Sequence, residues 1–302
     1  MAAYFEIDDV EAIYVIINDK DEMSCADKVH SMLPLYGALR DRVRIIVPSE
    51  ILEWNFAQAI RPSFLLKRLI VHHRKFFFLR VNKGWRGNHG WLMQQAFKLC
   101  IARVVTSEFT LILDCKNFLV GPTTSFDFVS PCGRPKSNLR TPSPAQRTWI
   151  KRAFEIFAIS APGPEEQTAP STTPFCIRTE ILQDCLNEAE RRLGPIEGYF
   201  GYRPFWARGG KKASEFMIMY AYVTYRFGGW LSIFDLGLPP AAAINRKMDD
   251  GTIEYMIDLV EQKKINVFSV HRSRVRDLNP VHLQRLRKIL KDRNLEISDI
   301  LF

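Results

Sequence analysis

The sequence predicts a single α/β domain over residues 1–302, with a mostly parallel, twisted central sheet flanked by helices. Three observations predict it. Two β-branched segments enclose a helical one near the start of the chain, and a helical pattern runs into a buried strand between residues 90 and 122. The third is size and composition: 302 residues, 47% of them hydrophobic and 25% charged, are enough for a large core in an ordinary globular protein.

The first strand–helix–strand unit covers residues 12–47. Ala12 to Ile17 is β-branched and aromatic, which predicts a buried strand. Ser24 is expected to cap a helix that runs to about Gly37, and residues 42–47 predict a second strand. This order predicts a right-handed crossover and therefore a parallel pair of strands.

The central stretch begins as a helix at Gly90. Apolar residues recur along it at spacings of three and four: Met93, Phe97, Cys100 and Val104. Gln94 and Lys98 lie one turn apart on a different face. An almost continuously apolar strand follows at residues 109–113 and ends in the polar residues 114–117 (Asp-Cys-Lys-Asn). Because ligands bind at the carboxyl ends of strands in open parallel sheets, these side chains predict a site.

Several segments between these elements have a less regular pattern. Residues 76–81 predict a further strand, and the glycine-rich residues 84–90 are either a phosphate-facing loop or a plain connecting turn. Long loops are expected at about residues 121–147 and 160–174. The first is either a basic lid over a pyrophosphate or an ordered surface excursion; its cations are Arg134, Lys136, Arg140 and Arg147.

Three helices are expected between residues 179 and 261. Thr179 is predicted to cap the first, which ends at Gly194. Ser214 is predicted to cap a tyrosine-rich helix that carries Glu215 in its first turn, where the helix dipole favours a carboxylate. Asp250 is predicted to cap the third.

The C-terminal part is expected to hold one strand and one helix. Residues 265–272 predict a strand that ends in His271 and Arg272. An amphipathic helix is predicted at about residues 279–293. Its outward-facing cations are expected to be Arg285, Lys288 and Lys291.

The composition limits the classes of partner. With 42 Lys and Arg against 33 Asp and Glu, the formal net charge is +9. This excess suits nucleic acid, an anionic membrane or a phosphate-bearing substrate. No nucleic-acid-binding motif accompanies the charge, so nucleic acid is not the expected partner. The basic C-terminal helix suggests peripheral contact with an anionic membrane.

Cysteine spacing and apolar runs predict the compartment. The six cysteines form no C-x-x-C pair, so neither a zinc site nor a disulfide framework is expected. The acidic first residues do not resemble a secretory signal, and no apolar run is long enough to span a bilayer. A cytoplasmic protein, with possible attachment at the inner membrane face, is the expectation.

The glutamine-rich helix followed by a strand that ends in Leu113 and Asp114 resembles the donor-site core of type-A-fold (GT-A) glycosyltransferases. It is most similar to an uncharacterised bacterial group of glycosyltransferase-like proteins from polysaccharide loci. In those enzymes a D-x-D motif grips a nucleotide sugar, usually through a divalent metal. Asp114 matches the first acidic position, whereas Lys116 stands at the second.

The resemblance implies a nucleotide-sugar-dependent, hexosyltransferase-like enzyme of bacterial capsule or lipopolysaccharide synthesis, with a glycan or lipid-linked acceptor. It implies that Asp114 and Glu215 are catalytic, Glu215 as an acceptor contact or as the base of an inverting reaction. The donor-binding residues that it implies are Asp114, Lys116, Asn117, Gln94, Lys98 and Arg272. The alternative function is a non-catalytic nucleotide- or polyanion-binding protein with a degenerate site of the same fold.

The cofactor expectation depends on Lys116. The resemblance gives Asp114 and His271 as ligands of Mn²⁺ or Mg²⁺, but an ammonium group two residues from Asp114 would repel a metal. Three possibilities stay open. Lys116 neutralises phosphate directly, or it points away and the metal is kept, or the site has degenerated.

Overall fold

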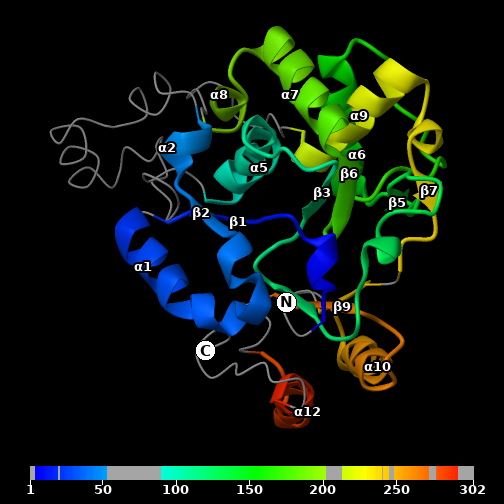
Figure 1. The fold of residues 1–302 in the computed structure, drawn as a ribbon. Coiled ribbons are helices and arrows are strands. Elements are labelled where there is room, and N and C mark those ends of the chain that lie inside the picture. Colours follow the sequence, from blue (N-terminus) through cyan, green and yellow to red (C-terminus); the bar gives the residue numbers. More distant parts are fainter. Residues whose placement is uncertain are drawn as a thin grey trace, which may run out of the picture.

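The computed structural model describes residues 4–19, 21–52, 90–201, 213–239, 241–244, 248–271 and 277–291, and it has a mixed α/β architecture (Figure 1). The helices are α1 (Glu22–Met32), α2 (Pro48–Ile51), α5 (Gly90–Cys100), α6 (Pro144–Ile156), α7 (Thr179–Leu193), α8 (Ile196–Gly201), α9 (Glu215–Phe227), α10 (Asp250–Glu261) and α12 (Pro280–Lys291). The strands are β1 (Ile13–Ile16), β2 (Val43–Ile46), β3 (Phe109–Ile112), β4 (Asn117–Leu119), β5 (Lys136–Ser137), β6 (Phe175–Arg178), β7 (Asp235–Leu236), β8 (Ala241–Ile244) and β9 (Val267–Val270).

The strands of the described ranges pair in four small sheets, where the sequence predicts one mostly parallel sheet. β1 and β2 are parallel, as the crossover rule predicts. β3 pairs with β6 and β4 pairs with β9, and both pairs are antiparallel. The segments that join β3 to β6 and β4 to β9 are long and contain further helices and strands, so the crossover rule does not fix how these strands pair.

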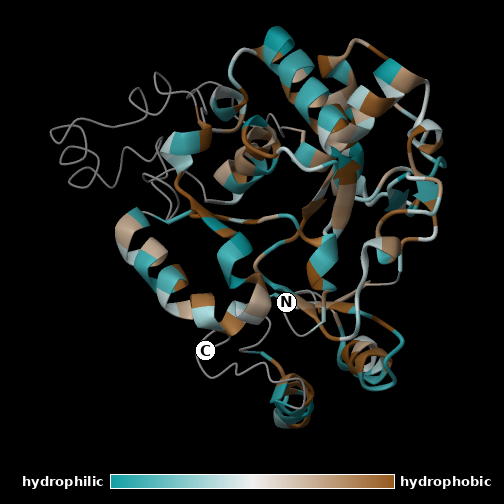
Figure 2. Ribbon diagram, in the orientation of Figure 1, coloured by the Kyte–Doolittle hydropathy of each residue, from teal (hydrophilic) through white to brown (hydrophobic). Residues whose placement is uncertain are grey.

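The larger hydrophobic core lies between β3, β6 and the helices α5, α6, α7 and α9. Figure 1 shows α6, α7 and α9 grouped on one side of the molecule. α9 is the most enclosed of them, since every residue from Glu215 to Val223 is buried. In Figure 2 the central strands are mostly brown and the visible face of α7 is mostly teal, as expected for a helix that covers a core.

A second, smaller core joins β8 and β9 to α10 and α12. α12 begins at Pro280, and Asn279 caps it by accepting a hydrogen bond from the backbone N–H of His282 at 2.8 Å. This confirms the predicted start of the helix. The predicted end at residue 293 lies outside the described residues.

One predicted orientation on α12 is wrong. Arg285 does not face outward: its guanidinium packs on α10 and pairs with Glu254, Asp258 and Glu261. Three carboxylates one turn apart on a neighbouring helix satisfy its donors better than water does. Lys288 and Lys291 are exposed, as predicted. Among the described residues, none of the helices has the length and apolar character needed to cross a membrane.

Three predicted helix caps are wrong, those of α1, α7 and α10. α1 is capped by Asp21, which accepts a hydrogen bond from the N–H of Ser24 at 3.1 Å. α10 is capped by Asp249 and not by Asp250. At α1 and α10 two residues able to cap a helix stand close together, and the side chain that reaches the free N–H groups is the earlier one.

α7 lacks its predicted cap, whereas the end of α7 and the cap of α9 are as predicted. α7 begins at Thr179, but the residue at its cap position is Arg178, which makes no side-chain cap. Its end at Gly194, with φ of 74°, is confirmed. Ser214 caps α9 as predicted, with its Oγ accepting from the N–H of Met217 at 3.4 Å.

The two long loops are joined to each other. The backbone N–H of Arg140 donates to Thr168 O and that of Thr168 to Arg140 O, both at 2.9 Å. The side chains of Arg134, Lys136 and Arg147 donate to backbone carbonyls of neighbouring segments. These contacts favour an ordered surface excursion over a basic lid. The strand predicted at residues 76–81 and the loop at 84–89 lie outside the described residues.

Candidate functional site

Asp114 lies in the turn between β3 and β4, and two reciprocal hydrogen bonds close that turn. The N–H of Asp114 donates to Oδ1 of Asn117 at 2.6 Å, and the N–H of Asn117 donates to the carbonyl oxygen of Asp114 at 2.8 Å. The hydroxyl of Thr173 donates to the same Oδ1 at 2.8 Å. Asn117 therefore fixes the backbone from which the Asp114 side chain projects.

Two ammonium groups hold the carboxylate of Asp114. Nζ of Lys98 lies 2.6 Å from its Oδ1, and Nζ of Lys116 lies 3.2 Å from its Oδ2. The side-chain amide of Gln94 also donates to Oδ1, at 3.1 Å. Gln94 and Lys98 reach the same oxygen because residues four apart on a helix share a face. The Asp114 side chain is 14% exposed, so these contacts are largely shielded from water.

Lys98 also pairs with a second carboxylate. Its Nζ lies 3.1 Å from Oε1 of Glu215, in the first turn of α9. The same nitrogen lies 4.9 Å from the centre of the Phe216 ring, within cation–π range. Glu215 is only 4% exposed. Lys98 therefore bridges the turn after β3 and the N-terminus of α9.

Burial and charge shift the acidities of these groups in opposite directions. Burial acts to raise the pKa of Asp114, but Lys98 and Lys116 outweigh it and lower that pKa. Burial acts to lower the pKa of Lys98, but Glu215 and Asp114 outweigh it and raise that pKa. For Glu215 burial outweighs Lys98, so its pKa is raised. The Glu215 carboxylate therefore holds a proton more readily than an exposed one does.

The structure brings together six residues that the sequence singles out separately. We call them the Asp114 cluster: Gln94, Lys98, Asp114, Lys116, Asn117 and Glu215. Two lysines and two carboxylates give it a formal charge of zero. An anion that takes over the lysines would leave the carboxylates in excess, so anion binding here requires the ion pairs to rearrange.

His271 lies at the same edge of the three-stranded sheet β4–β9–β8 as the Asp114 turn. β9 runs antiparallel to β4 with Asn117 opposite Ser269, so the chain after Ser269 continues toward Cys115. The N–H of His271 donates to Ile244 O at 3.0 Å, which keeps its backbone in line with β8. Arg272, the other residue predicted at this strand end, lies outside the described residues.

The contacts of Asp114 do not suit a divalent cation. Both carboxylate oxygens face ammonium groups, and a metal would have to displace them. In the ranges that the structure describes, no three His, Cys, Asp or Glu side chains are grouped so that they could hold a metal ion.

Sequence reasoning missed two residues near the cluster. Thr173 stands in the second long loop, and nothing in its local pattern indicates that it contacts Asn117. Gln95 is only 2% exposed, and in the described part of the chain neither polar atom of its side chain has a hydrogen-bond partner. The sequence offers one signal for Gln95, which is a second glutamine in a mostly apolar helix. A buried amide normally finds a hydrogen-bond partner, so a glutamine among apolar residues is unusual.

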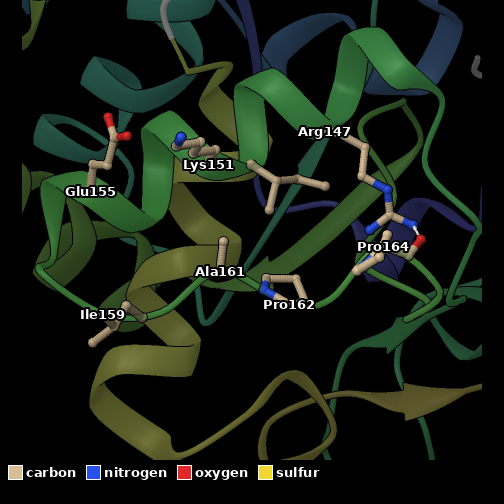
Figure 3. Close-up of a pocket in the computed structure, with 8 residues that line it drawn as sticks. Arg147, Lys151, Glu155, Ile159, Ala161, Pro162 and Pro164 are labelled. Carbon is tan, nitrogen blue, oxygen red and sulfur yellow. Dashed lines mark hydrogen bonds between the residues drawn. The ribbon is translucent and has the colours of Figure 1, made fainter.

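A separate groove of about 410 Å³ lies between α6 and the segment that follows it (Figure 3). Its walls are mostly apolar, with charged side chains among them: Arg147, Ile150, Lys151, Glu155, Ile159, Ala161, Pro162 and Pro164. Arg147 donates to the carbonyl oxygens of Gly163 and Pro164, so its guanidinium ties the two walls together. No residue of the Asp114 cluster lines this groove.

Comparison with protein-family models gives no match to this chain, and comparison with curated proteins gives none either.

Proposed function

We propose that the chain is a nucleotide-sugar-dependent glycosyltransferase with a fold of the type-A glycosyltransferase kind, whose Asp114 cluster binds the donor pyrophosphate. The proposal includes a hexosyltransferase-like activity in bacterial surface polysaccharide synthesis, with a glycan or lipid-linked acceptor. The observation that carries it is the meeting of Lys98, Lys116, Asp114 and Glu215 in one place. These residues lie in three separate segments of the chain, and the sequence pattern singles out each of them.

Lys98 and Lys116 are the proposed phosphate-binding groups. Departure of a nucleoside diphosphate requires that negative charge on the pyrophosphate be neutralised, and fixed cations in a shielded site do this effectively. Lys116 is the more exposed of the two, at 39% of its side chain, and would meet the ligand first. Asp114 and Glu215 hold the lysines in place when no ligand is bound.

Glu215 is the proposed proton acceptor. In a transfer that inverts the anomeric centre, the acceptor hydroxyl oxygen bonds to the anomeric carbon and its proton passes to the Glu215 carboxylate. The bond from that carbon to the phosphate oxygen breaks, and the pyrophosphate leaves with the electron pair. The raised pKa of Glu215 supports this role, because a base works best when its pKa approaches the working pH.

This form of the proposal is independent of metal. The ammonium group of Lys116 occupies the place of the second acidic residue of the D-x-D pattern, and with Lys98 it supplies two positive charges beside the same carboxylate. Two ammonium groups together carry the charge of one divalent cation, so they are an adequate substitute as a phosphate-neutralising device.

A second candidate function is binding of a nucleotide without catalysis. It is favoured by the same ion pairs, since both oxygens of Asp114 are already engaged and Glu215 is almost completely buried. Turnover separates the two candidates. Release of free sugar or of a glycosylated product from the bound nucleotide sugar supports the enzyme, and binding without any release supports the second candidate.

The test of the proposal is a thermal-shift panel of UDP-, GDP-, CMP- and ADP-sugars with and without Mn²⁺. A ligand that binds the folded state raises the melting temperature by mass action. We expect one nucleotide to stabilise the protein equally with and without Mn²⁺, and Lys116→Ala to abolish that stabilisation. Lys151→Ala, which removes an exposed lysine of the separate groove, is the matched control. No response to any nucleotide would overturn the proposal.

A further inference from the structure

Trp91 is a tryptophan with half of its surface in water. It lies in the first turn of α5 and is 49% exposed. Its ring centre lies 5.9 Å from that of Trp149 on α6, with the two planes tilted by 40°. Trp149 is itself packed against the larger core. The indole of Trp91 therefore packs beside a side chain that is anchored on the core.

Trp91 lies on the side of α5 that carries the Asp114 cluster. It precedes Gln94 by three residues and Lys98 by seven, and at 100° per residue all three fall on one side of the helix. With a rise of about 1.5 Å per residue, Trp91 is about 4.5 Å along the axis from Gln94 and about 10.5 Å from Lys98. Its indole is one turn beyond the amide that contacts Asp114.

The exposed half of Trp91 offers a ligand a large apolar surface beside polar groups. Tryptophan has the largest apolar surface of any side chain, and leaving half of it in water forgoes burial energy. Ligand sites combine such aromatic surfaces with a few convergent polar groups. Here the polar groups are the amide of Gln94 and the charged groups of the cluster, which donate and accept hydrogen bonds.

We propose that the exposed indole of Trp91, packed beside Trp149, is a stacking platform for a pyranose ring. The C–H face of a sugar packs on an aromatic face, while its hydroxyl groups reach the polar atoms beside it. A pyranose next to phosphate-binding lysines matches the order of groups along α5, from indole to amide to ammonium. This inference rests on the proposed function and names the part of the substrate that Trp91 recognises.

The pyranose has two possible sources, the donor sugar and the acceptor glycan, and the experiment separates them. Its variants are Trp91→Ala, which removes the platform, and Trp91→Phe, which keeps an aromatic face. Tyr255→Ala is the matched control, because Tyr255 is 59% exposed on α10 and belongs to no part of the cluster. Dissociation constants are measured for the nucleoside diphosphate that responds, for its sugar conjugate, and for free oligosaccharides in the presence of that diphosphate.

If the donor sugar stacks on Trp91, Trp91→Ala lowers the affinity for the sugar conjugate about tenfold and leaves the affinity for the diphosphate unchanged. If the acceptor stacks there, the variant lowers the affinity for the oligosaccharide by a similar factor and leaves the affinities for the diphosphate and its sugar conjugate unchanged. Trp91→Phe retains most of the affinity in either case, and Tyr255→Ala has no effect.

Two results would overturn the platform without affecting the proposed function. In the first, the diphosphate and its sugar conjugate lose affinity equally in Trp91→Ala, which assigns the indole to the nucleobase. In the second, all affinities stay unchanged. If wild-type protein binds no nucleotide, the proposed function fails, and the platform then depends on the free oligosaccharides alone. If the wild-type protein also binds none of the free oligosaccharides, the stacking platform is overturned as well.

Discussion

Nζ of Lys98 lies 3.1 Å from Oε1 of Glu215, 117 positions further along the chain, and 2.6 Å from Oδ1 of Asp114. One ammonium group thus neutralises two carboxylates that arrive from different elements, the turn after β3 and the start of α9. Its side chain is 11% exposed and that of Glu215 is 6% exposed. The stability of this part of the molecule and the proposed binding of anions therefore both depend on Lys98.

Lys98→Met should destabilise the protein by about 3 kcal/mol, because it leaves the buried Glu215 carboxylate without a counter-charge. The free energy of unfolding from urea denaturation measures this. The double variant Lys98→Met with Glu215→Gln should recover about half of the loss, since no buried charge is then left unpaired. Lys151→Met, at an exposed lysine of α6, should change stability by less than about 0.5 kcal/mol. A double variant no more stable than Lys98→Met would show that the bridge is not the cause.

The pH dependence of stability should have opposite signs at the two carboxylates. The pKa of Glu215 is raised in the folded protein, so its contribution is fully present in acid and is lost as pH rises. Glu215→Gln should therefore gain stability relative to wild type as pH rises above about 4, the ordinary value for a glutamate. The pKa of Asp114 is lowered, so its contribution is present at neutral pH and is lost as pH falls. Asp114→Asn should accordingly lose stability relative to wild type as pH rises toward about 4 and just above it, the range in which an ordinary aspartate titrates. Urea denaturation across this range gives both slopes, and slopes of equal sign would contradict the assignment.

Removing a carboxylate without removing a lysine should strengthen anion binding. Glu215→Gln raises the formal charge of the cluster from zero to +1, so nucleoside diphosphate affinity should rise about fivefold, or by about 1 kcal/mol. If Glu215 is the proton acceptor, turnover falls sharply in the same variant. Calorimetric titration and product release are the two measurements. Weaker nucleotide binding in Glu215→Gln would argue that the carboxylate contacts the ligand directly.

Asn117→Ala should loosen the turn that carries Asp114. It removes the acceptor of the Asp114 N–H and of the Thr173 hydroxyl, at a cost of about 2 kcal/mol. Thr173→Val removes only the second of these bonds and should cost about 1 kcal/mol. Both variants should also lower the affinity for the nucleoside diphosphate, because the ion pairs of Asp114 are no longer held in place. Asn138→Ala, which removes a single hydrogen bond to Leu238 O at 2.9 Å, is the control that should change stability without changing affinity.

The sequence predicted the local elements of the site better than it predicted their assembly. The helical face of Gln94 and Lys98, the polar end of β3 and the first turn of α9 follow from periodicity and capping, which are short-range properties. The antiparallel pairing of β3 with β6 depends on where a distant segment returns, and no local pattern encodes it. The contact between Lys98 and Glu215 is of the same long-range kind, and so is the hydrogen bond from Thr173 to Asn117.

The outward orientation predicted for Arg285 failed for a related reason. Amphipathic periodicity places a residue on a face of its helix, but it does not say which neighbour that face meets. α10 presents Glu254, Asp258 and Glu261 to α12, so a position that would be solvated on an isolated helix is paired in the folded chain. The exposed cations of a surface helix can be counted only after its neighbours are known.

The turn at Asp114 joins β3, which packs in the larger core, to β4 of the three-stranded sheet β4–β9–β8. β3 pairs with β6 beside the larger core. β4 pairs with β9, and β9 also pairs with β8. A ligand that tightens this junction would restrain both sides of it, although it touches only a few side chains. Backbone amides of β9 should then exchange with deuterium more slowly when the cluster is occupied.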